Sequence, residues 1–249
     1  MKVESYLMHD FTAKTSADSV DVEQRKAYYA VKELFGGILS VIILLLVSPL
    51  LLFIAILIKI DSPGPILFAQ TRVGAQRKRV NGKWVWQRQD FRFYKFRTMV
   101  LNADPEIHKA YVQALINNDE EKMAEIQQTH TDVRKLIRDL RITKVGKYLR
   151  KFSLDELPQF YNVIRGDMSI IGPRPAIPYE VDVYKPWQLG RLQAKQGITG
   201  LQQVTVRSIH SFDEQVKYDL EYIRRQSLLL DLVIFIETPL ALFKTKGAR

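Results

Sequence analysis

Two adjacent carboxylates, Asp155 and Glu156, form the densest chemical signal in the sequence. They follow the cations Arg150 and Lys151 and precede a run with helical periodicity. An ionised carboxylate can attack a phosphorus atom, and a neighbouring carboxylate can hold a magnesium ion that neutralises a diphosphate. The pair is therefore a candidate for phosphoryl chemistry, with Asp155 as the nucleophile and Glu156 as the metal ligand.

The same residues also allow a purely structural interpretation. Ser153 and Glu156 have the spacing of a capping box, in which both side chains satisfy free backbone amides at a helix start. With Ser153 as N-cap, however, Pro158 would occupy the fifth helical position, where a backbone N–H donor is required. The alternative is a helix that begins later, so that both carboxylates project from its N-terminus beside Arg150. That positive environment would lower the pKa of Asp155.

Further cations have a pattern suited to phosphate binding. Arg174 stands between two prolines, which restrict the backbone and present its guanidinium rigidly, and guanidinium groups match phosphate oxygens. Lys95 and Arg97 alternate with the aromatic residues Tyr94 and Phe96. We predict phosphate contacts for these three cations. A surface arginine in a proline-rich loop, a half-buried strand and a nucleic-acid surface are the alternatives.

These residues need a scaffold, and its first element is apolar. Residues 38–60 are interrupted only by Ser40, Ser48, Pro49 and Lys59, which meets the length of a membrane helix. A proline at the centre removes a backbone donor and clashes with the preceding turn. We therefore expect a kink at Ser48-Pro49, where the serine hydroxyl can bond a freed carbonyl.

Cationic residues flank both ends of this apolar run. Under the positive-inside rule a single span should have an asymmetric charge distribution, so we predict a re-entrant helix that enters and leaves the same leaflet. An ordinary kinked span is the alternative. The flanking cations are Arg25, Lys26 and Lys32 before the run, and Lys59, Arg72, Arg77, Lys78 and Arg79 after it.

The remaining pattern predicts an α+β fold that is mainly helical. Asn81-Gly82 is typical of a two-residue turn, so we expect a small antiparallel β-hairpin around it. The apolar stretch 228–243 is too short and polar to span, and we expect an interfacial helix there. The predicted parts are a polar N-terminal tail at 1–30, the re-entrant membrane helix at 31–61, and a cytosolic catalytic domain at 62–249 with a helical insert at about 102–140.

The composition limits the classes of partner and of chemistry. The 249 residues carry a formal net charge of +10, which indicates an anionic partner such as nucleic acid, anionic lipid or a phosphorylated substrate. The chain has no cysteine, which excludes thiol nucleophiles and disulfide scaffolds. Its four histidines form no metal-ligand spacing, and we expect no role for them.

Taken together, several motifs resemble the bacterial sugar transferase family, the monotopic polyprenyl-phosphate phosphoglycosyl transferases that initiate glycan assembly. The resemblance covers roughly residues 32–245 in the family's order. The motifs are the Ser48-Pro49 membrane segment and the segments at 68–72, 94–99, 153–159, 166–169, 172–175 and 197–201.

The resemblance implies a two-step reaction. Asp155 attacks the sugar-bearing phosphate of a nucleotide diphosphate sugar, expected to be a UDP-sugar, and releases UMP. Polyprenyl phosphate, such as undecaprenyl phosphate, then attacks the aspartyl phosphosugar. By the same resemblance Glu156 binds Mg²⁺, while Lys95, Arg150 and Arg174 lie at the phosphates. The implied location is the cytosolic face of the bacterial cytoplasmic membrane.

Two other functions remain open from the sequence. A membrane-anchored nucleic-acid-binding protein would use the net charge and the aromatics at 84–97, but it leaves Asp155 and Glu156 unexplained. A non-catalytic scaffold would use its helical insert for partner contacts. The sugar transferase assignment has no nucleic-acid partner. Formation of a homodimer and the identity of the donor sugar stay undecided.

Overall fold

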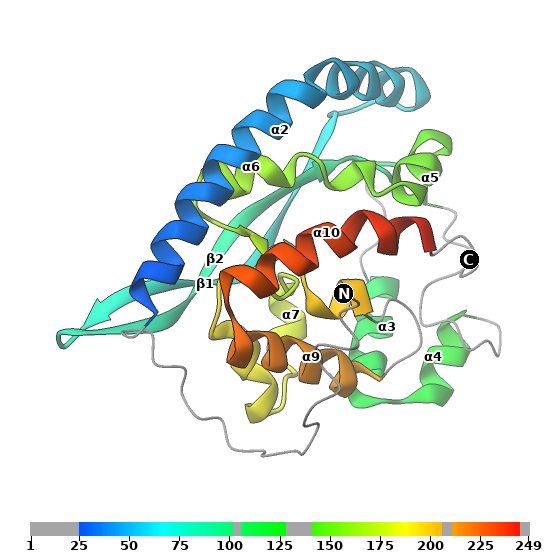
Figure 1. Cartoon of the computed structure of the whole chain (residues 1–249). Coiled ribbons are helices and arrows are strands. Elements are labelled where there is room, and N and C mark those ends of the chain that lie inside the picture. Colours follow the sequence, from blue (N-terminus) through cyan, green and yellow to red (C-terminus); the bar gives the residue numbers. More distant parts are fainter. Residues whose placement is uncertain (1–24, 102–105, 128–140, 206–210, 245–249) are drawn as a thin grey trace.

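The computed structural model describes residues 25–101, 106–127, 141–205 and 211–244. Most of the predicted polar tail and part of the predicted helical insert lie outside these residues. The described part is mainly helical with an antiparallel hairpin, as predicted (Figure 1).

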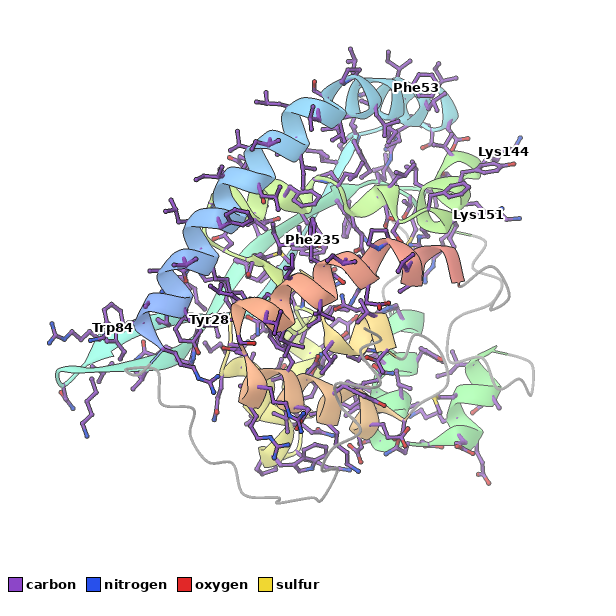
Figure 2. The ribbon with its side chains drawn as sticks, in the orientation of Figure 1. Tyr28, Phe53, Trp84, Lys144, Lys151 and Phe235 are labelled. Atoms are coloured by element: carbon purple, nitrogen blue, oxygen red, sulfur yellow. The ribbon has the colours of Figure 1, made fainter. Side chains whose placement is uncertain are left out.

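The first described element is the long helix α2 (Lys26–Asp61), which contains Pro49. Pro49 cannot donate to the carbonyl of Leu45, and the Ser48 hydroxyl donates to that same oxygen at 2.8 Å. The predicted compensation is therefore confirmed. Figure 1 shows that α2 changes direction before its C-terminal part, which carries Phe53 (Figure 2).

By length and composition α2 could cross a membrane, and no other helix among the described residues passes that test. Only 11% of its most apolar window is buried, whereas the core helix of a soluble protein is mostly covered. At 1.5 Å per residue its 36 residues extend to about 54 Å, well beyond the ~30 Å hydrocarbon core of a bilayer. A straight α2 along the bilayer normal would therefore extend beyond the apolar layer.

Strands β1 (Leu67–Val80) and β2 (Lys83–Phe96) form the predicted hairpin, with Leu67 paired to Phe96 and Val80 to Lys83. Asn81 and Gly82 have φ values of 49° and 82°, and two left-handed residues are what a type I′ turn requires. The hairpin runs along α2, with Trp84 near its turn (Figure 2).

The remaining described elements are helices and two short strands. They are α3 (Glu106–Asn117), α4 (Glu120–Gln127), α5 (Lys144–Lys151), η1 (Leu154–Glu156), α6 (Gln159–Ile164), β3 (Ser169–Ile171), α7 (Pro178–Val181), η2 (Pro186–Leu192), β4 (Gly197–Thr199), α8 (Leu201–Thr205), α9 (Phe212–Arg225) and α10 (Leu228–Lys244). Strands β3 and β4 pair in parallel, which was not predicted from the sequence.

The main hydrophobic core joins one face of β2 to the C-terminal helices. Phe91 and Phe93 pack in one cluster with Ile171 of β3, Tyr222 of α9 and Ile234 of α10. A second cluster joins the end of α2 to α5 and the end of β2. It contains Ile54, Ile58, Phe96 and Leu149. The first cluster thus holds β2 just before Lys95 in the sequence, and the second cluster holds it just after.

Asn162 attaches α6 to the free edge of β2. Its side-chain oxygen accepts from the Tyr94 backbone N–H at 3.1 Å, and its amide nitrogen donates to the Arg92 carbonyl at 2.6 Å. The same nitrogen lies 3.3 Å from the Asp167 carboxylate. Asn162 is completely buried, so its own polar side-chain atoms depend on these hydrogen bonds.

Substituting Asn162→Ala should lower the free energy of unfolding by about 1–3 kcal/mol, because it removes the partner of two partly buried β2 backbone groups and leaves a cavity in place of a buried side chain. Thermal unfolding in detergent micelles should show a lower midpoint. Asn117→Ala, the same change at an exposed position, is the matched control and should unfold like the wild type. Equal midpoints for the two variants would contradict this role of Asn162.

Candidate active site

Asp155 lies in the short 3-10 helix η1, between α5 and α6. Ser153 has a left-handed backbone, with φ at 54°, and makes no side-chain cap. Helix α6 begins only at Gln159, with Pro158 as its N-cap. The capping-box interpretation is therefore wrong. The alternative is confirmed, since the helix begins later and both carboxylates precede it.

Helix α5 is docked tightly against the end of β2. A Cβ atom at Gly146 would lie 2.2 Å from the Thr98 carbonyl oxygen, so only glycine allows this approach. The Thr143 hydroxyl caps the helix by accepting from the Gly146 N–H at 3.0 Å. One turn later, Arg150 Nε donates to the Thr98 hydroxyl at 2.9 Å. These contacts hold the guanidinium of Arg150 beside the segment that carries Asp155.

The Asp155 side chain is buried, and its residue is only 8% exposed. Burial raises the pKa of Asp155, the adjacent charge of Glu156 raises it further, and Lys95, Arg150 and Arg174 oppose this shift. The predicted lowering of this pKa is therefore wrong, because desolvation outweighs the cations. The three cations nevertheless act on the carboxylate, so the structure brings them into its neighbourhood, and their contact with phosphate stays a prediction.

Lys95 is the β2 residue of this group. Burial lowers the pKa of Lys95 to about 8, and Arg150 adds to the shift while Asp155 opposes it. Its ammonium nitrogen lies 5.3 Å from the centre of the Phe68 ring on the paired strand. A cation that is poorly solvated in the free protein loses little hydration when an anion binds, which favours a phosphate contact.

Arg174 lies in the loop between β3 and α7. Its Nη1 lies 3.4 Å from Glu156 Oε1, and about half of its side chain is exposed. Its loop is attached to β1, because Arg72 Nη1 donates to the Pro175 carbonyl at 3.1 Å and the Val73 N–H donates to the next carbonyl at 2.8 Å. From the sequence, Arg72 was counted only as a cation flanking the apolar run and as part of the 68–72 motif, and its contact to this loop was not predicted.

Arg97 was predicted to contact phosphate, but the structure uses its guanidinium elsewhere. Its Nη1 donates to the Pro63 carbonyl at 2.6 Å, and its Nη2 donates to the carbonyl and hydroxyl of Ser62 at 2.7 and 2.9 Å. Arg97 is 4% exposed. It therefore ties down the loop that follows α2, and its phosphate role stays a prediction.

Helix α3 of the insert also reaches the edge of this group. His108 Nδ1 lies 2.7 Å from the Tyr179 hydroxyl on α7, and the two rings are in edge-to-face contact. Burial and the nearby cations, Arg72 first among them, lower the pKa of His108 to about 4. A neutral histidine thus borders the cationic site, although the sequence analysis expected no role for any histidine.

The carboxylates of the site can be compared with the ways in which proteins hold magnesium. Among the described residues, no group of three or more His, Asp or Glu side chains gathers into a metal cage. Magnesium, however, is commonly held by one or two carboxylates together with substrate phosphates. Glu156 is partly exposed and paired only weakly with Arg174, so its carboxylate fits this arrangement.

Comparisons with known proteins find relatives over most of the chain. The profile of the family described as bacterial sugar transferase matches residues 27–245. The exopolysaccharide production protein ExoY of Rhizobium meliloti (strain 1021) is 37% identical over 217 residues, which cover 87% of each chain.

Two further relatives are longer proteins. The undecaprenyl-phosphate galactose phosphotransferase of Salmonella typhimurium is 36% identical over 87% of this chain and 41% of its own length. The UDP-glucose:undecaprenyl-phosphate glucose-1-phosphate transferase of Escherichia coli (strain K12) is 37% identical over 85% of this chain and 40% of its own. Because the family profile matches nearly the whole described structure, the chain belongs to the bacterial sugar transferase family.

Proposed function

We propose that the protein transfers a sugar 1-phosphate from a UDP-sugar to a polyprenyl phosphate such as undecaprenyl phosphate. The observation that carries this proposal is a buried carboxylate, Asp155, surrounded by Lys95, Arg150 and Arg174 in a member of the bacterial sugar transferase family. Two relatives are named for undecaprenyl-phosphate transfer, one of galactose and one of glucose, which supports the acceptor and leaves the sugar open.

In the first step an Asp155 carboxylate oxygen attacks the sugar-bearing phosphorus of the donor. The bond from that phosphorus to the oxygen of the UMP leaving group breaks, and UMP departs with the bonding electrons. In the second step a phosphate oxygen of the acceptor attacks the same phosphorus and displaces the carboxylate. Asp155 is thereby restored, and the lipid diphosphate sugar is the product.

The neighbouring residues would bind the substrate phosphates and hold the site's side chains in position. Lys95, Arg150 and Arg174 would face the donor phosphates, where fixed cations in a poorly solvated site stabilise developing charge. A bound Mg²⁺, held by Glu156 together with the diphosphate, would neutralise further charge. The Arg72 contact to the loop at Pro175 keeps Arg174 in position. Because each cation comes from a different element, the site depends on the whole packing arrangement.

The contacts at the two ends of α2 support the re-entrant arrangement. Near its start, Tyr29 donates to Gln226 at 3.0 Å and Lys32 pairs with Asp231 at 3.0 Å. At its end, the Asp61 carboxylate accepts from the Val145 N–H at 2.9 Å. Both ends are thus attached to one globular part, which lies on one side of a membrane. We propose that α2 dips into the cytoplasmic membrane from its cytosolic face.

Single cysteines test this topology cleanly, because the chain has none of its own. Exposed Ala27 and Lys59 at the two ends of α2 should react, as cysteine variants, with an impermeant maleimide in inverted vesicles but not in spheroplasts. Lys78→Cys in the hairpin gives the cytosolic reference. Labelling of either helix end in spheroplasts would show a spanning helix instead.

The reaction itself is tested by release of UMP from a panel of UDP-sugars, with purified protein, Mg²⁺ and undecaprenyl phosphate. We expect turnover with at least one donor, UDP-glucose and UDP-galactose being the first to assay. Asp155→Asn keeps the size of the side chain but removes the attacking charge, so it should lower kcat by at least about 1,000-fold. Asp182→Asn, at an exposed carboxylate that follows the last residue of α7, is the matched control and should stay within about twofold.

Full turnover by Asp155→Asn would contradict the assignment of the nucleophile. No turnover by the wild type with any donor would contradict the proposed reaction and favour the scaffold. Binding of RNA or DNA that weakens steeply with salt, in the absence of turnover, would favour the nucleic-acid alternative.

Lys95 makes the reaction sensitive to alkaline pH. Its ammonium is charged below its pKa of about 8 and neutral above it, so donor kcat/KM should fall as the pH rises from 7 to 9. Lys95→Arg should remove this fall, because a guanidinium stays protonated throughout that range. A wild-type profile that is flat from pH 7 to 9, or an identical fall in Lys95→Arg, would contradict a charged role for Lys95.

A further inference from the structure

An apolar groove of about 820 Å³ lies between α2, the hairpin and α6. Leu44, Leu51 and Leu52 line it from α2, Leu67 lines it from β1, and Tyr161 lines it from α6. Leu52, Leu67 and Tyr161 are 65%, 44% and 49% exposed. None of the lining side chains carries a formal charge, and the volume lies within the range of ligand-binding sites.

The bend of α2 accounts for the position of the groove. Leu44 precedes Pro49 and Leu51 follows it, so both sections of the helix contribute a wall. The last turns of α2 are held down separately, because Ile54 and Ile58 pack against Phe96 and the start of α5. The groove therefore opens beside the apolar part of α2, where a hydrocarbon chain can enter from the membrane.

The groove shares two walls with the candidate active site. Successive side chains of a strand point to opposite faces, so Tyr94 and Phe96 line the groove while Lys95 between them acts on Asp155. Pro158, three residues after Asp155 and immediately before α6, also lines the groove. Strand β2 and the segment that follows Asp155 thus contribute both to the groove and to the candidate active site.

We propose that this groove binds the first isoprene units of the polyprenyl phosphate acceptor, a role that rests on the proposed function. Its lining suits a hydrocarbon and offers no charge to a nucleotide. Its nearness to Lys95 and Asp155 selects a chain that carries a phosphate at its end, since such a chain can lie in the groove while its phosphate reaches the site. An acyl chain of a bulk phospholipid has no such link to catalysis.

Narrowing the groove tests this proposal. Leu52→Trp should raise the KM for undecaprenyl phosphate at least tenfold and leave the KM for the donor within twofold. Leu46→Trp is the matched control, because Leu46 is a 76% exposed leucine of the same helix that does not line the groove. An unchanged acceptor KM in Leu52→Trp, or an equal rise in Leu46→Trp, would overturn the assignment.

A second measurement remains informative if Leu52→Trp fails to fold. Wild-type protein is irradiated with a prenyl phosphate that carries a diazirine in its second isoprene unit, and the crosslinked peptide is mapped by mass spectrometry. We expect crosslinks at residues 44–52 or at Tyr161, which excess undecaprenyl phosphate removes. Crosslinks elsewhere, or ones that phospholipid removes equally well, would overturn the proposal. Failure of the proposed function is distinct, because the wild type would then show no turnover.

Discussion

Burial of one carboxylate among several cations is the interaction on which the rest of this structure depends. Desolvation disfavours the charged form of Asp155, and cations from three separate elements offset that penalty. Lys95 comes from β2, Arg150 from α5 and Arg174 from the loop before α7, so these elements must meet at one point. The same desolvation leaves the carboxylate more basic than an exposed one, which suits the proposed attack on phosphorus.

Close contacts between the surrounding elements bring the three cations to one point. Asn162 attaches α6 to the edge of β2, Gly146 lets α5 approach Thr98, and Arg72 holds the loop that carries Arg174. The membrane helix joins the same arrangement, since its last turns pack on β2 and α5. Under the proposed reaction the site would receive a lipid phosphate at the edge of a bilayer, and the helix that could enter that bilayer packs on the same elements that carry the site.

Local signals made part of this architecture predictable. Asn81-Gly82 encodes its turn through backbone preferences of the two residues themselves, and Pro49 removes a donor wherever it stands in a helix. Features that depend on contacts between distant residues have no such local signal in the sequence. Strands β3 and β4 are three residues each and pair in parallel across the chain, so neither shows a usable periodicity. Arg97 looked like a phosphate ligand from its neighbours, yet only the fold brings the Ser62 carbonyl to its guanidinium. The sign of the Asp155 pKa shift depended on burial, which sequence spacing does not report.

The central claim is that Asp155 becomes covalently attached to the phosphosugar. The most direct measurement is intact-protein mass spectrometry after incubation with the donor and Mg²⁺ in the absence of acceptor, followed by peptide mapping. The wild type should gain the mass of one sugar phosphate, located on Asp155, and should lose it when undecaprenyl phosphate is added. Turnover without any such adduct, or an adduct on another residue, would contradict the mechanism.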